Sequence, residues 1–126
     1  MKILVSMIVA ALLQSPAAPK KGGNPEAAKI RNPVAASADS TAAGKRVYTR
    51  MCSRCHGPEG KGDGTAATAP VPDLTDAKWD YGGSDGEIFS VVHDGVSADM
   101  DGYAARLSDT DIWNVVNYVR SVAAKP

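Results

Sequence analysis

The sequence lacks the features that mark several large protein classes. Its longest apolar stretch runs over 11 residues, from Ile3 to Leu13, whereas a membrane-spanning helix needs about 20. Its formal net charge is zero, with 14 basic and 14 acidic residues, so there is no basic footprint for duplex nucleic acid. With 126 residues, the chain has room for one small domain. We therefore expect no transmembrane span and no nucleic-acid partner.

The sequence also has little from which to build a core. Seven aromatic residues and no sustained apolar–polar alternation argue against a β sandwich. Twelve glycines and eight prolines interrupt much of the chain, and such residues mark turns and loops. We predict an all-α domain of a few helices and long loops, with a bound group supplying part of the core.

Composition divides the chain into three parts. Residues 1–17 have a short basic start, the apolar stretch and small residues at the end, which is the pattern of a cleaved export signal. Residues 18–38 are rich in Ala and Pro and have no periodicity, so we predict a flexible linker. The folded domain is then 39–126, in a periplasmic or otherwise extracytoplasmic compartment.

Apolar periodicity predicts three main helices. The first covers residues 43–51 and continues into the cysteines that follow. The second and third begin at capping boxes, 84–87 and 108–111. Gly95 is placed to end the second helix. Three residues can cap the start of the first helix: Asp39, Ser40 and Thr41.

Both cysteines and one of the two histidines stand together as Cys52, Cys55 and His56. Cys-x-x-Cys-His is the attachment signature of c-type haem, in which both thiols become thioethers and the imidazole binds iron. At the end of a helix, the two thiols project to one side and the imidazole can turn under the ring. The Gly- and Pro-rich stretch 57–83 follows, and a loop of that length is typical of a segment wrapped around a ligand. We predict one covalently bound haem c.

Three other interpretations use the same residues. A thioredoxin-like dithiol begins a helix after a strand, whereas this motif ends a helix. A zinc site built from Cys52, Cys55, His56 and His93 has two adjacent ligands and lacks the usual spacing of a second pair. A disulfide between Cys52 and Cys55 closes too short a loop to stabilise much and leaves the core small.

Beyond the motif, residues 40–124 resemble a small single-haem class I cytochrome c. In that family a Gly and an aromatic residue, eight and four positions before the first cysteine, pack the N-terminal helix against an aromatic residue of the C-terminal helix. Gly44 and Tyr48 hold these positions, with Trp113 and Tyr118 opposite. The resemblance implies the cytochrome c fold: three main helices and long loops around one haem.

The resemblance also implies further contacts to the haem. In the family a Pro carbonyl accepts the proton of the ligand histidine, and the segment with Pro72 and Leu74 resembles that loop. Trp79 and Tyr81 resemble aromatic residues that donate hydrogen bonds to a haem propionate, although filling of the core is an equally good interpretation. Met100 lies between the second and third helices, where the family places its distal methionine. It is thereby implied as the second axial ligand.

Other residues compete with Met100 for that role. Met1 and Met7 lie in the predicted export signal, and Met51 neighbours Cys52, where packing is the simpler interpretation. His93 stands near the end of the second helix, where a histidine is most simply a solvated or dipole-stabilised side chain.

An iron held by both His56 and Met100 has no open position, which suits one-electron transfer. The sequence therefore predicts a monomeric electron carrier of a respiratory or photosynthetic chain, with redox proteins as partners. A haem peroxidase or gas sensor is the alternative if Met100 does not bind iron. A haem-free, disulfide-containing interaction module is a third possibility.

Overall fold

The computed structural model describes residues 15–125, and in that range it contains helices and no β-strand. Among these residues no helix has both the length and the apolar character needed to cross a membrane. The three main helices that periodicity predicts are all present, and two short ones accompany them. In chain order the helices are α1 (Pro25–Ala28), α2 (Ala38–Met51), α3 (Ser53–His56), α4 (Asp85–Asp94) and α5 (Asp109–Val122).

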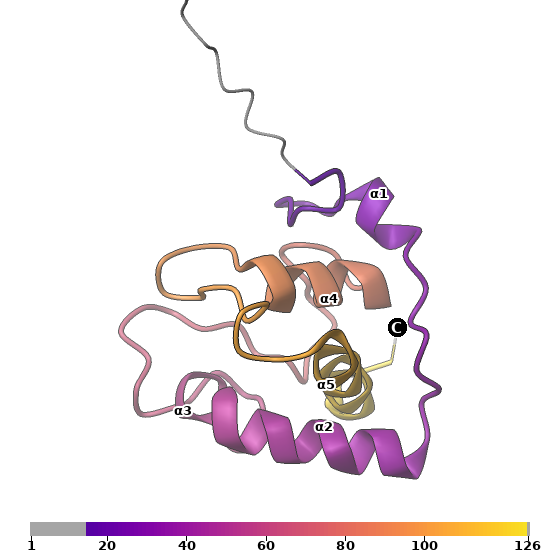
Figure 1. The fold of residues 1–126 in the computed structure, drawn as a ribbon. Coiled ribbons are helices and arrows are strands. Elements are labelled where there is room, and N and C mark those ends of the chain that lie inside the picture. Colours follow the sequence, from indigo (N-terminus) through magenta and orange to yellow (C-terminus); the bar gives the residue numbers. More distant parts are fainter. Residues whose placement is uncertain (1–14, 126) are drawn as a thin grey trace, which may run out of the picture.

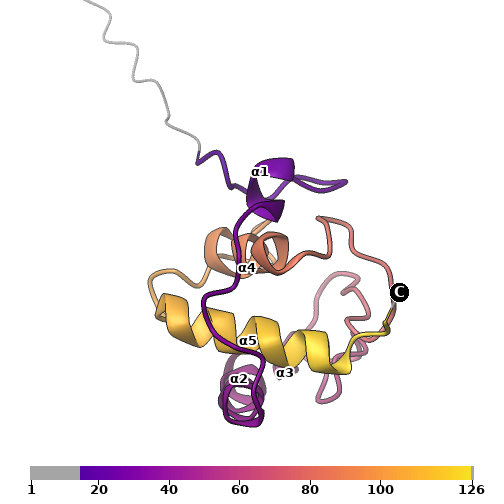
Figure 2. The ribbon, with the colours of Figure 1, turned by 90° about the vertical axis from the view of Figure 1, so that its right-hand side faces the viewer.

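Helices α2 and α5 cross at the centre of the molecule. Figure 1 shows α2 lengthwise and α5 end-on, and Figure 2 shows the reverse. Gly44 permits this crossing, because a Cβ there would collide with the backbone carbonyl of Asn114. The rings of Tyr48 and Tyr118 pack beside it with centroids 5.1 Å apart. The roles predicted for these two tyrosines and for Gly44 agree with this packing.

Trp113 does not share in that crossing, contrary to the prediction. Its ring stacks on Phe89 of α4, with centroids 4.0 Å apart, and it belongs to a second core cluster with Ile88 and Val116. Trp113 and Tyr118 are five positions apart, which places them about 140° apart around a helix axis. One of them therefore faces α4 when the other faces α2.

The helix ends follow their sequence signals closely. The Ser84 hydroxyl accepts a hydrogen bond from the backbone N–H of Glu87, and the Glu87 carboxylate accepts one from the Ser84 N–H in return, so the predicted capping box is formed. Gly95 ends α4 with a φ of 74°. Helix α2 begins earlier than expected, because Ser37 caps it instead of Asp39, Ser40 or Thr41.

The N-terminal strap (residues 22–37) packs on the helices, although residues 18–38 have the composition of a flexible linker. Ala27 in α1 is completely buried. The backbone N–H of Asn24 donates to the Glu87 carboxylate at 2.9 Å, and the N–H of Gly22 donates to the Asp80 carbonyl at 2.7 Å. In Figures 1 and 2 the strap leaves α1 beside α4 and runs down to the start of α2.

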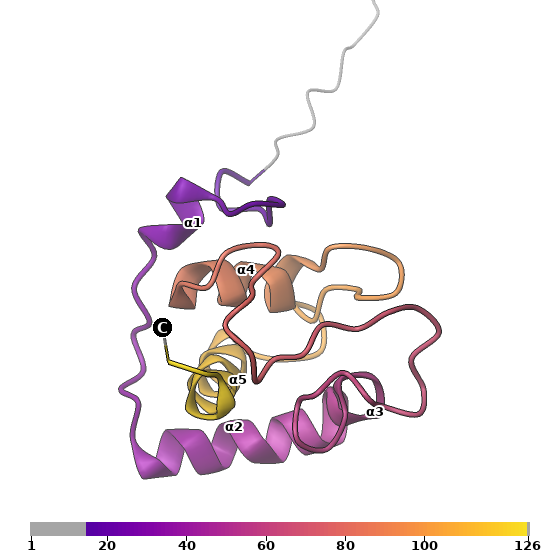
Figure 3. The ribbon, with the colours of Figure 1, turned by 180° about the vertical axis from the view of Figure 1, so that it is seen from behind.

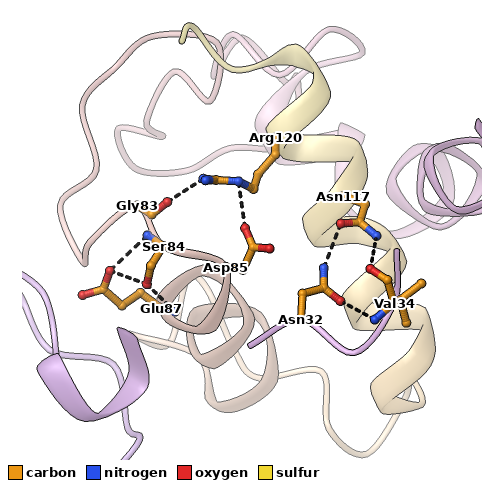
Figure 4. Close-up of polar contacts among 8 residues, drawn as sticks. All are labelled: Asn32, Val34, Gly83, Ser84, Asp85, Glu87, Asn117 and Arg120. Atoms are coloured by element: carbon orange, nitrogen blue, oxygen red, sulfur yellow. Dashed lines mark hydrogen bonds and ion pairs between the residues drawn. The ribbon is translucent and has the colours of Figure 1, made fainter. Parts of the chain in front are cut away.

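A second polar cluster holds the strap against α5 (Figure 4). The Asn117 side chain, only 5% exposed, accepts from Asn32 Nδ2 at 2.8 Å and donates to the Val34 carbonyl at 3.1 Å. It also donates to the Ser40 hydroxyl at 2.8 Å. Such contacts carry no periodicity, which is why the sequence pattern predicted a linker instead. The predicted export signal, residues 1–17, lies almost entirely outside the described residues.

Candidate haem site

One apolar cavity of about 380 Å³ lies between α2, α3, α4 and the loops that join them. Its wall includes small and apolar residues of the loops and the inner faces of α4 and α5. All the site residues predicted from the sequence border this cavity: Cys52, Cys55, His56, Pro72, Leu74, Trp79, Tyr81 and Met100. Segments nearly 50 positions apart in the chain thus meet around one space.

The two cysteines sit where α2 gives way to α3. Helix α2 ends at Met51, and Cys52 has a φ of −119°, which breaks the helix before α3 continues to His56. Both cysteines are half-buried and unbonded to one another. Burial raises the pKa of the Cys52 thiol to about 11, and the neighbouring Cys55 adds to the effect. The pair therefore presents two neighbouring sulfurs to an apolar space, as thioether formation with a haem requires.

The loop after the cysteine motif folds back, and its backbone N–H groups donate hydrogen bonds to carbonyls of the motif. The carbonyl of Cys55 accepts from Gly64 N at 3.2 Å, and the carbonyl of His56 accepts from Gly62 N at 2.8 Å. The last carbonyls of a helix have no partner within the helix, so these loop contacts fix the end of α3. Figure 3 shows the long connection, in rose, leading on from α3 across to α4.

His56 has the chemistry of a metal ligand. Burial lowers the pKa of its imidazole, which favours the neutral ring that a metal ion binds. Its Nδ1 is buried and has no hydrogen-bond partner in the described part of the chain, so the predicted bond to the Pro72 carbonyl is not formed. In a ligating imidazole, the acceptor bound by one ring nitrogen helps to orient the other nitrogen toward the metal.

Met100 borders the cavity from the loop between α4 and α5. Its carbonyl accepts from Val96 N at 2.9 Å, and its N–H donates to the Ser97 hydroxyl at 3.2 Å. His93, the competing ligand, is not among the cavity-lining residues. Its Nδ1 lies 2.7 Å from Asp94 Oδ1, so the imidazole contacts a carboxylate near the surface.

Trp79 and Tyr81 also border the cavity. Within residues 15–125 neither side chain donates a hydrogen bond to the protein, so both donors are free to bind another acceptor. The wall is held in place from α5, where Arg120 contacts the Asp85 carboxylate at 2.7 Å and donates to the Gly83 carbonyl at 2.6 Å (Figure 4).

Sequence reasoning overlooked part of the wall. Residues 66–71, a run of small and apolar side chains, border the cavity; their position between the cysteine motif and Pro72 was the available signal. Tyr103 was also missed. Its hydroxyl donates to the Met51 carbonyl at 3.1 Å, immediately before the first cysteine.

The donors around the cavity fit a haem: two sulfurs, a neutral imidazole and a thioether within an apolar wall. Residues 39–119 match the model of a protein family described as cytochrome c oxidase, cbb3-type, subunit III. The chain belongs to this family. The cytochromes of this family carry covalently bound haem c, so the cofactor class predicted from the sequence is confirmed.

Individual relatives agree with the family model. The cbb3-type cytochrome c oxidase subunit CcoP of Azospirillum sp. (strain B510) is 34% identical over 72% of this chain, but over only 31% of its own length. The chain thus spans about a third of the relative that it matches.

Two solved structures share the fold. A Kuenenia stuttgartiensis reducing HAO-like protein complex has a chain 28% identical, with a TM-score of 0.67, covering 75% of this chain and 50% of that one. Cytochrome c6 of the diatom Phaeodactylum tricornutum is 30% identical, with a TM-score of 0.55, covering 66% and 93%. The all-α cytochrome c fold predicted from the sequence is therefore confirmed.

Proposed function

We propose that the chain binds one haem c through Cys52 and Cys55, with His56 and Met100 as axial ligands, and carries single electrons outside the cytoplasm. The observation that carries this proposal is the meeting of both thiols, the imidazole and the thioether around one apolar cavity. His93 does not border that cavity, which favours Met100 over a second histidine.

The side chains around the cavity have distinct tasks in this proposal. When bound, the haem supplies an iron that alternates between the ferric and ferrous states. Cys52 and Cys55 anchor the ring, and the neutral imidazole of His56 donates a nitrogen lone pair. The apolar wall from Leu74, Val92 and neighbouring residues excludes water, which helps to set the potential. With His56 and Met100 both bound to it, the iron would have no position left for a substrate.

The relatives indicate what kind of partner to test. The CcoP protein of Azospirillum is by name an oxidase subunit, so we propose a membrane oxidase or its electron donor as redox partner. The export pattern of residues 1–17 supports an extracytoplasmic location. The monomeric state predicted from the sequence stays a prediction.

Visible spectra of the protein, produced in a host with working cytochrome c maturation, test the ligand set. We expect sharp ferrous bands, a weak long-wavelength band in the ferric state and reversible cycling between the two. Met51→Leu, a control methionine beside Cys52, should keep the long-wavelength band. A high-spin ferric spectrum would instead indicate an open iron, as in a peroxidase or gas sensor, and a colourless product would contradict haem binding.

A further inference from the structure

Tyrosine hydroxyls hold the two ends of the haem-attachment segment (residues 51–57). The Tyr48 hydroxyl donates to the Gly57 carbonyl at 2.6 Å, and the Tyr103 hydroxyl donates to the Met51 carbonyl at 3.1 Å. Backbone N–H groups of the segment itself and of the following loop pair with every carbonyl in between. Only the two ends therefore have side-chain donors.

The Met51 carbonyl needs such a donor because the helix breaks beside it. In a continuous helix it would accept from Cys55 N, four positions on. Instead the N–H groups of Cys55 and His56 both donate to the Cys52 carbonyl, at 3.2 and 2.9 Å. Among residues 15–125 no backbone N–H donates to the Met51 carbonyl, and Tyr103 supplies the hydrogen bond.

Tyr103 is itself fixed by several contacts. Its N–H donates to the Val92 carbonyl at 2.9 Å, and its own carbonyl accepts from Leu107 N at 2.9 Å. The guanidinium of Arg106 lies 4.1 Å from the centre of its ring. The ring packs half-buried on the main hydrophobic cluster. The hydroxyl is therefore held at a defined place, with little freedom to leave the Met51 carbonyl.

Tyr103 belongs to the Met100 loop (residues 95–107), three positions after Met100 itself. Within the described chain, the Tyr103–Met51 bond is the only hydrogen bond between that loop and the attachment segment. The loop also meets the cavity lining where the Thr68 hydroxyl donates to the Asp99 carboxylate at 3.5 Å, but that contact is exposed and long.

We propose that Tyr103 is a positioning residue that couples the Met100 loop to the haem-attachment segment. The hydroxyl ties the loop that carries one axial ligand to the residue before the first attachment cysteine. The two sides of the cavity are thereby kept at a fixed separation, and the loop opens less often. This inference rests on the proposed ligation by Met100.

Binding of imidazole to the ferric protein measures how often the loop opens, because imidazole reaches the iron only after Met100 has left it. With Met100 as ligand, the wild-type rate should level off at high imidazole concentration. Tyr103→Phe removes one hydroxyl, and a neutral hydrogen bond contributes about a factor of two to ten in such an equilibrium. We expect the limiting rate to rise by about that factor, with a weaker long-wavelength band.

Tyr118→Phe is the matched control. Tyr118 is 7% exposed and packs on Tyr48. Its hydroxyl makes no hydrogen bond within residues 15–125, so the limiting rate should stay at the wild-type value. An unchanged or slower rate in Tyr103→Phe, or an equal rise in both variants, would overturn the coupling. A wild-type protein without the long-wavelength band, and with a rate that never levels off, would contradict the proposed ligation instead.

Discussion

The attachment segment and the N-terminal strap are both short stretches that contain a single turn of helix, α3 and α1, but different kinds of contact hold them. Most hydrogen bonds to the attachment segment come from neighbouring residues of the chain, as between Gly62 and His56, and Tyr103 supplies the one from a distant side chain. Buried side chains from distant helices hold the strap, with Glu87 and Asn117 as the principal acceptors and donors. The cysteine motif indicates the attachment segment in the sequence, whereas the composition gives no indication that the strap is packed.

The difference indicates separate roles for the two regions. The attachment segment borders the cavity and supplies two thiols and an imidazole to it. No residue of the strap borders the cavity. The strap contacts residues around it, as Gly22 does Asp80 and Asn24 does Glu87. Loss of the first should abolish function, and loss of the second should weaken the fold while the haem remains.

The largest effect is expected when both cysteines are removed. The Cys52→Ala, Cys55→Ala double variant should lose covalent haem completely. It should also show no cooperative unfolding transition by circular dichroism, because a domain this small has little stability to spare without the group that fills its cavity. Ser53→Ala, between the two cysteines, should keep both. A double variant that still folds cooperatively would show that the haem is not part of the core.

Removal of the proposed distal ligand should change the iron without unfolding the chain. Met100→Ala should abolish the long-wavelength ferric band, lower the midpoint potential and open the iron to peroxide, because a thioether ligand raises the potential and fills the sixth position. Spectra and voltammetry measure this. His93→Ala should leave all three properties unchanged. If the results of the two variants were exchanged, a histidine pair would be the ligand set.

Release of the strap should have a moderate effect. Glu87→Gln weakens the acceptor that binds Asn24 and Ser84, and hydrogen bonds to a charged group contribute about 1.5–3 kcal/mol. We expect the free energy of unfolding to fall by about 1–3 kcal/mol in chemical denaturation, with faster tryptic cleavage at Lys29 and Arg31. Glu26→Gln, which alters only an exposed contact with Lys29, should be nearly neutral. Retained stability in Glu87→Gln would mean that packing alone holds the strap.

The same carboxylate predicts a pH dependence. Burial disfavours ionisation of Glu87, but hydrogen bonds from the Ser84 side chain and backbone and from the Asn24 backbone outweigh it and lower its pKa. A carboxylate with a lowered pKa stabilises the fold above its ordinary pKa of 4.5. That contribution is lost as the pH falls through the folded-state value. The difference in the free energy of unfolding between wild type and Glu87→Gln should therefore become smaller at acidic pH.

The smallest effect concerns the charges beside Met100. Asp99 borders the cavity, whereas Asp101 does not. Negative charge favours the ferric form, so Asp99→Asn and Asp101→Asn should both raise the midpoint potential, by tens of millivolts at most. Asp99→Asn should have the larger effect, and both should diminish at high salt. Asp39→Asn, at the start of α2, is the matched charge control. A fall in potential would contradict the placement of this loop beside the iron.

The sequence was a good guide wherever a local signal exists. The capping serines Ser84 and Ser108, Gly95 and the apolar stripes predicted α4 and α5, whereas the apolar stripe predicted only the later part of α2 and its cap was misassigned. Trp113 was misplaced because a resemblance assigns a position in the chain and not a face of a helix. The strap was missed because its contacts depend on Asn117 and Glu87, which are polar residues on predicted helices and would ordinarily be assigned to solvent.

In the candidate site, too, local sequence signals could be interpreted and long-range contacts could not. The spacing of Cys52, Cys55 and His56 indicates haem attachment by itself, and the resemblance to the cytochromes c supplied Met100 and Pro72. Tyr103 could not be found in this way. Its partner is a backbone carbonyl, which becomes available only because α2 breaks at Cys52. Such a break is visible in the structure and leaves no mark in the sequence.

The intact mass of the mature protein, made in a host with cytochrome c maturation, tests the central claim most directly. Covalent attachment predicts the mass of the processed chain plus one haem, retained after acid denaturation, and the mass of the chain alone for the Cys52→Ala, Cys55→Ala variant. A wild-type mass equal to the chain alone, or lower by two hydrogens for a Cys52–Cys55 disulfide, would contradict the account.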